Sequence, residues 1–199
     1  MPDIKNKTPK RSFLPRVVST KLPFSTSKIP EMHKIYQAVE NSTIAIMLAA
    51  AMTNCERAPS TGEKKRCVGC VEDMMDFAIS ILGRNLTVLT TLNDEGSENN
   101  IMIGKVRAIN DGTAVSCHQI LFPYSFYYCH SVPEVRVYQA EILDPKTNIK
   151  INHAIALCHL DTSSWSFDHG AFLVLGSGLS KIEVCHWVFQ TDMAWVQIY

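Results

Sequence analysis

Residues 117–130 read CHQILFPYSFYYCH, and a Cys-His dipeptide stands at each end of this stretch. Two more such dipeptides follow in the chain, Cys158-His159 and Cys185-His186. Random placement of the seven cysteines and seven histidines would give about 0.25 such dipeptides. The spacers between the four dipeptides have 10, 27 and 25 residues. They therefore form no tandem repeat, and the fold must bring distant positions together.

Each dipeptide ends a β-prone run or lies within one. Successive side chains of a strand point to opposite faces, so a Cys and the His after it cannot share a face. Three uses stay open: disulfides with histidines as mere neighbours, a zinc site of thiolates and imidazoles, or oxidised cysteines beside a histidine-only metal site. Opposite faces disfavour the mixed zinc site, which also normally uses close cysteine pairs. Imidazole suits several transition metals, and copper(II) is bound most strongly among them.

The chain around this stretch predicts an α+β fold, with an N-terminal arm and helices before a mainly antiparallel, disulfide-stapled β region. Five prolines in residues 1–30 predict an extended arm that packs on the domain. Residues 31–83 are expected to be helical and residues 86–199 to form the β part. We expect a single domain over residues 12–199.

Three helices are predicted from apolar spacing and capping residues: Glu31–Glu40, a segment capped by Ser42 or Thr43 that ends near Asn54, and Val71–Leu82 before Gly83. Cys55–Cys67 is expected to be a polar loop. The β-prone runs are Leu86–Leu92, Val106–Ile109, Ala114–His118, Phe126–His130, Val135–Leu143, Lys150–His159, Ala171–Leu175, Ile182–Phe189 and Trp195–Tyr199.

Composition limits the partners and the compartment. Nineteen basic residues balance 19 acidic ones, which argues against a nucleic-acid partner or broad binding to anionic membranes. The most apolar run, Ile44–Met52, is too short to span a bilayer. Seven cysteines and the sequons at Asn6, Asn41 and Asn85 favour the secretory pathway, with the signal peptide outside this chain. We expect a monomer.

The dipeptides, their spacers and Trp195, nine positions after His186, resemble the hallmark of the plant BURP domain. The resemblance covers residues 12–197 and includes these further segments: Phe13-Leu-Pro-Arg16, Pro23-Phe-Ser25, Cys55-Glu56, Gly62-Glu63-Lys64, Cys67, Asp76-Phe77, Pro123-Tyr124, Tyr128-Cys-His130, Asp161-Thr-Ser-Ser-Trp165 and His169-Gly-Ala-Phe172.

The resemblance implies secretion in a plant, with the apoplast, cell wall or vacuole as destination. Some members of that family are peptide cyclases, and the resemblance implies a copper-dependent oxidative macrocyclase. Such an enzyme would use dioxygen to join a Tyr or Trp side chain to another residue of a core peptide. The implied copper ligands are His118, His130, His159 and His186. The implied disulfide cysteines are Cys117, Cys129, Cys158 and Cys185, with three connectivities open, and Cys55 with Cys67. The alternative is a secreted, non-catalytic module of seeds, stress responses or cell walls that binds copper or is purely structural.

The chain also departs from that family. It lacks the leader region in which many cyclases carry their own core peptide, so the peptide substrate would be a missing precursor segment or a separate molecule. Cys70 stands where the family usually has a small residue, and it is either a buried thiol or an intermolecular or reactive one.

Several other side chains have two interpretations. His169 is either an orienting hydrogen-bond partner or a further metal ligand, and His153 is expected at the surface. Asp161 could fix the tautomer of a ligand imidazole. Four aromatic residues are either core or a wall for a bound peptide: Tyr124, Tyr127, Tyr128 and Trp165.

Overall fold

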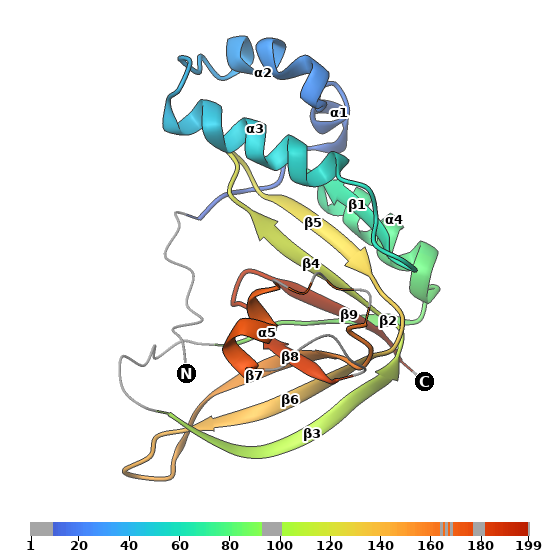
Figure 1. The fold of residues 1–199 in the computed structure, drawn as a ribbon, viewed down its shortest axis with the longest axis vertical. Helices are drawn as coiled ribbons and strands as arrows, with labels where there is room; N and C mark the ends of the chain where they lie inside the picture. The colour runs from blue at the N-terminus through green and yellow to red at the C-terminus, as the bar shows by residue number, and fades with distance from the viewer. Residues whose placement is uncertain are drawn as a thin grey trace.

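The computed structural model describes residues 10–92, 101–163, 165, 167, 169–176 and 182–198, and shows two antiparallel sheets beside a layer of helices (Figure 1). The helices are α1 (Arg16–Ser19), the 3-10 turn η1 (Thr26–Lys28), α2 (Ile29–Ile35), α3 (Thr43–Glu56), α4 (Val71–Leu82) and α5 (Gly170–Leu175). The strands are β1 (Lys64–Val68), β2 (Leu86–Leu89), β3 (Met102–Gly112), β4 (Ala114–Ile120), β5 (Phe126–Ser131), β6 (Val135–Leu143), β7 (Lys150–His159), β8 (Val184–Trp187) and β9 (Met193–Gln197).

The first sheet has the order β1-β5-β4-β9-β2, and the second has the order β3-β6-β7-β8. Every named strand pair is antiparallel. The two sheets pack face to face through apolar side chains of β4 and β9 on one side and of β6 and β7 on the other. The predicted α+β class with a disulfide-stapled antiparallel β region is confirmed.

Helix α4 covers the outer face of the first sheet. Met74, Phe77 and Ala78 pack there against the cystine of Cys117 and Cys129. The helix ends as predicted at Gly83, whose φ of 80° needs a residue without a Cβ. Helices α2 and α3 form a separate core with the aromatic turn between β4 and β5.

The N-terminal arm differs from its prediction. Residues 1–9, with the sequon at Asn6, lie outside the described part, and the following residues form α1, η1 and α2 rather than an extended strap. Pro15 immediately precedes α1, and Pro30 lies in the first turn of α2. Proline fits a helix start because the first turn leaves its backbone N–H groups unpaired, so these prolines begin helices.

Three other element predictions need correction. The helix expected over Glu31–Glu40 ends at Ile35, and Gln37 beyond it has a φ of 50°. Residues within the supposed polar loop form β1, which pairs with β5 at the edge of the first sheet. The run Ala171–Leu175, predicted as a strand, forms most of helix α5. Only Phe172 is buried in this run, so it lacks the alternating burial of a strand.

No helix in the described ranges is long and apolar enough to cross a bilayer.

Candidate functional site

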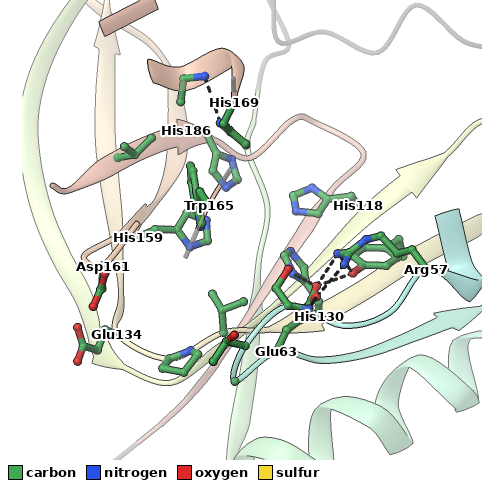
Figure 2. A pocket seen from close by; sticks show the side chains of 18 of the residues that line it. Arg57, Glu63, His118, His130, Glu134, His159, Asp161, Trp165, His169 and His186 are labelled. Atoms are coloured by element: carbon green, nitrogen blue, oxygen red, sulfur yellow. Dashed lines mark hydrogen bonds and ion pairs between the residues drawn. The ribbon is translucent and has the colours of Figure 1, made fainter. Parts of the chain in front are cut away.

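A cavity of about 960 Å³ opens between the two sheets (Figure 2). The first sheet and the loop before β1 contribute one wall, and β7, β8 and the segment up to α5 contribute the other. Its polar and aromatic lining includes Arg57, Glu63, His118, Tyr128, His130, His159, Trp165, His169 and His186. The cavity therefore gathers the histidines of all four Cys-His dipeptides.

Strand register explains how the first two dipeptides are arranged. Cys117 of β4 lies directly opposite Cys129 of β5, and the two form a disulfide. The next residue in each strand points to the other face, so His118 and His130 become diagonal neighbours on the cavity side.

The second sheet repeats the same unit. Cys158 of β7 lies opposite Cys185 of β8 and is disulfide-bonded to it, with His159 and His186 diagonal to each other. Each sheet thus presents one pair of imidazoles beside one cystine. The third disulfide joins Cys55 and Cys67, near the loop that carries Glu63.

The four imidazoles form a row across the gap between the sheets. Their ring centroids are 5.4 Å apart for His130 and His118, 5.7 Å for His118 and His186, and 5.5 Å for His186 and His159. The middle contact joins the two sheets. His159 is 8% exposed, whereas the His118 side chain is 32% exposed. The row is therefore open to solvent at His118 and closed at His159.

Two carboxylates hold the histidines of the first sheet. The Nδ1 atom of His118 lies 3.0 Å from Oδ2 of Asp192, and the Nδ1 atom of His130 lies 3.0 Å from Oε1 of Glu63. Glu63 also accepts two hydrogen bonds from Arg57 and one from the hydroxyl of Tyr128. The Glu63 side chain is only 1% exposed, so this network is shielded from water.

Burial and neighbouring groups set the charge of these residues. Burial would raise the pKa of Glu63, but hydrogen bonds from His130, Arg57 and Tyr128 outweigh it and hold that pKa well below its usual value. Burial lowers the pKa of His130 and of His186. Burial and the neighbouring imidazoles lower the pKa of His159 to about 3. These three imidazoles are neutral at pH 7, the state that can bind a metal.

Trp165 and His169 extend the row of rings beyond His159. The centroid distances are 5.2 Å from His159 to Trp165 and 4.3 Å from Trp165 to His169. The Nδ1 atom of His169 accepts the backbone N–H of Ala171 and so caps α5. Figure 2 shows His169 and Trp165 at the α5 end of the cavity.

The remaining candidate residues have different places. Tyr124 and Tyr127 lie in the apolar cores, whereas Tyr128 belongs to the Glu63 network. His153 pairs with Glu141 on β6 and is not among the cavity residues.

Asp161 lines the cavity, and Cys70 caps helix α4 by accepting the backbone N–H of Asp73. Sequence reasoning gave no role to Glu63, Arg57 or Asp192. Only Glu63 had a signal, because it belongs to a segment that carried the family resemblance.

The histidine row is the part of the site that could hold a metal ion. Within the described ranges, the only three ligand atoms within 4.8 Å of one another belong to Cys158, Glu183 and Cys185, and the disulfide removes both thiolates from that group. The histidine nitrogens thus do not converge in threes at that distance as placed. Neighbouring imidazoles in the row still offer nitrogen donors in a solvent-connected cavity, and imidazole is a donor type that suits copper, zinc, iron and nickel.

Comparison with known proteins identifies relatives over almost the whole chain. The sequence profile described as the BURP domain matches residues 1–197. The polygalacturonase-1 non-catalytic subunit beta of Solanum lycopersicum is 62% identical over 198 residues, which are 98% of this chain and 31% of that protein. The polygalacturonase 1 beta-like protein 3 of Arabidopsis thaliana is 61% identical, and BURP domain-containing protein 12 of Oryza sativa subsp. japonica is 46% identical. Both matches also cover 98% of this chain, and 32% and 31% of those proteins. The chain therefore spans about a third of the length of these relatives.

These names correct the predicted activity. Three relatives at 61–62% identity are called non-catalytic subunits of polygalacturonase. The expectation of an enzyme, and of a peptide macrocyclase with a peptide substrate, is therefore wrong. Dioxygen entered only as the oxidant of that reaction. The disulfides and the polygalacturonase-subunit relatives are consistent with a protein of the secretory pathway or the cell exterior.

Proposed function

The chain belongs to the BURP-domain family, and on this premise we propose that it is a non-catalytic domain that associates with a polygalacturonase in the apoplast or cell wall. The observation that carries this proposal is the 62% identity, over 98% of the chain, to a protein named a non-catalytic polygalacturonase subunit. The match extends through the cavity and both disulfide-stapled sheets, so the relative has a counterpart for the whole domain.

The surroundings of Glu63 make this residue unsuited to act as the acid of a hydrolase. Glycoside hydrolases use two carboxyl groups, and one of them must be protonated to act as the acid. The carboxylate of Glu63 is buried and has a lowered pKa, and its oxygens accept hydrogen bonds from Arg57, Tyr128 and His130. It is thus a structural anion and a poor proton donor.

Association is tested by mixing the purified domain with a purified polygalacturonase and measuring the mass of the eluting species by size-exclusion chromatography with light scattering. A cell-wall hydrolase of similar size and unrelated substrate is the control partner. We expect the domain to form a complex with the polygalacturonase and not with the control hydrolase. We also expect the isolated domain to release no galacturonate. Elution of the two proteins as separate species, or hydrolysis by the isolated domain, would overturn the proposal.

We further propose that the histidine row binds copper through His118, His130, His159 and His186. The support is the meeting of four imidazoles from two sheets, with three of them neutral at pH 7 through burial. In a non-catalytic domain the ion would act as a cross-link between the sheets. A disulfide module without metal is the competing possibility.

Copper binding is tested with chelator-treated protein, by titration calorimetry and electron paramagnetic resonance after addition of copper(II) sulfate. We expect nitrogen hyperfine structure in the wild-type spectrum and a weaker, altered signal in His130→Ala. His153→Ala is the matched control, since His153 lies outside the cavity lining. A spectrum of aqueous copper, or equal binding by His130→Ala and wild type, would reject the site.

A further inference from the structure

The carboxylate of Asp192 has its two oxygens assigned to different donors. Oδ1 accepts the backbone N–H of Gln119 at 2.8 Å, and Oδ2 faces Nδ1 of His118 at 3.0 Å. Asp192 is 6% exposed and directly precedes β9, whose pairing with β4 fixes its position. The side chain therefore has one oxygen available to His118 and little freedom to turn.

Glu63 is surrounded in the same manner. Oε2 accepts the backbone N–H of Ser60 at 2.7 Å and one N–H of Arg57 at 3.0 Å. Oε1 accepts a second N–H of Arg57, the hydroxyl of Tyr128 and Nδ1 of His130. The Ser60 amide and the Arg57 guanidinium can only donate, so they fix the position of the carboxylate. The His130 imidazole and the Tyr128 hydroxyl can donate or accept, and here they must donate to it.

These contacts determine the tautomer of both imidazoles. A neutral imidazole has one nitrogen that donates and one that accepts, while an ionised carboxylate only accepts. The neutral forms of His118 and His130 must therefore carry the hydrogen on Nδ1, which leaves the lone pair on Nε2. His186 follows the same rule, because its Nδ1 lies 3.3 Å from the backbone carbonyl of Trp187.

We propose that Glu63 and Asp192 are positioning residues that hold His130 and His118 as Nδ1–H tautomers and so present both Nε2 atoms to a metal ion in the cavity. Histidines that bind metals commonly donate their other N–H to a carboxylate or a backbone carbonyl, which fixes the ring and strengthens the ligand. This inference rests on the proposed copper site. It adds two residues that do not touch the ion.

Amide variants test the role without removing the side chain. In Asp192→Asn the amide oxygen keeps the Gln119 N–H, so the amide NH₂ turns toward His118 and donates to Nδ1. In Glu63→Gln the oxygen keeps the Ser60 N–H and one N–H of Arg57, while the NH₂ faces His130 and loses the second Arg57 hydrogen bond. Each variant should move the hydrogen of its own histidine to Nε2 and block the ligand atom, just as an amide in place of a triad carboxylate imposes the wrong tautomer.

The first measurement uses metal-free protein and long-range proton–nitrogen correlation spectra of the histidine rings above pH 7. We expect Nδ1–H tautomers for His118 and His130 in the wild type. Each amide variant should convert its own partner, and Glu141→Gln, an exposed carboxylate on β6, should convert neither. Nε2–H tautomers in the wild type would overturn the inference whether or not copper binds.

The second measurement is the affinity for copper(II) by competition with a chelator of known affinity. Loss of such a hydrogen-bond partner typically costs about 10–100-fold in metal affinity, and we expect this loss for Glu63→Gln and Asp192→Asn but not for Glu141→Gln. Unchanged affinity in both amide variants would overturn the positioning role. A wild type with the predicted tautomers that binds no copper would instead reject the copper site. If one variant does not fold, the other and the wild-type tautomers still decide the question.

Discussion

At the scale of single residues, burial decides which form of each cavity imidazole is present. The pKa of His159 is lowered to about 3, first by burial and then by its neighbours His186, His130, His118 and His169. An imidazole in an unfolded chain titrates near pH 6.5. Between these two pKa values His159 is protonated in the unfolded chain but neutral in the folded protein, so lowering the pH favours unfolding.

We therefore predict that the metal-free protein loses stability as the pH falls from about 6.5 to about 3, and that His159 contributes on the order of 1 kcal/mol per pH unit in this window. His159→Gln removes that contribution, and its stability should fall less steeply. Urea unfolding at pH 7, 6, 5 and 4 in the presence of a chelator measures the difference. Parallel pH profiles for wild type and variant would contradict the assignment.

The sequence predicted the residues of the histidine row better than the residues that hold it. The four Cys-His dipeptides are so improbable by chance that they drew attention to every ring in the row. Glu63 and Asp192 gave no comparable signal, because a single carboxylate is common and its partner lies 67 or 74 positions away. Only the pairing of β1 with β5 and of β9 with β4 brings them to the histidines.

At the scale of elements, the Cys55–Cys67 disulfide ties the end of α3 to β1. The segment between them carries Arg57 and Glu63, which form part of the cavity wall. A cross-link that closes a loop of this length limits the freedom of the unfolded chain. It also keeps the segment that positions His130 close to the sheet.

The double variant Cys55→Ala/Cys67→Ala should be less stable than the wild type by about 3 kcal/mol, the loop-closure value for a separation of 12 residues. Urea unfolding monitored by tryptophan fluorescence measures the change. Proteolysis of the 55–67 segment should also be faster in the double variant, because the disulfide no longer joins its two ends. Equal stability of the double variant and the wild type would show that the native contacts of α3 and β1 suffice.

Cys70 has a structural role at the start of α4. Its sulfur accepts the backbone N–H of Asp73, and the side chain is fully buried. Serine is among the preferred residues at this position, because its oxygen is a better acceptor for the same N–H. We predict that Cys70→Ser changes the free energy of unfolding by less than about 1 kcal/mol, whereas Cys70→Val, which cannot accept, costs about 1 kcal/mol or more. Similar losses in both variants would argue against the cap.

The elements that were wrongly predicted share a physical cause. Proline breaks the interior of a helix but fits its first turn, and Pro15 and Pro30 could not be assigned to either role without the following turns. The run Ala171–Leu175 has strand-like composition but only one buried residue, Phe172. Burial pattern depends on tertiary packing, so a short apolar run does not reveal whether it is a strand or a helix.

At the scale of the whole molecule, the two sheets meet at the contact between His118 of the first and His186 of the second. The sequence indicated that distant dipeptides come together, but it could not give the strand orders that achieve this. The order β1-β5-β4-β9-β2 places a strand from the end of the chain between strands from its middle. Such long-range pairing depends on the packing of both sheets around one core, which no local pattern records.

The cross-sheet contact makes copper binding a test of the architecture. An ion bound only by the folded protein, at a free concentration 100 times its Kd, stabilises that state by about 2.7 kcal/mol. For a chain of this size, that stabilisation corresponds to a rise in Tm of roughly 5–11 °C. We predict such a rise for the wild type in differential scanning fluorimetry.

The variant His118→Ala/His186→Ala should lose most of this rise, because it removes one ligand from each sheet. His153→Ala/His33→Ala removes two histidines outside the cavity lining and should retain it. If the double cavity variant kept the full rise, the ion would be bound elsewhere and the two sheets would be held together by their apolar core and disulfides alone.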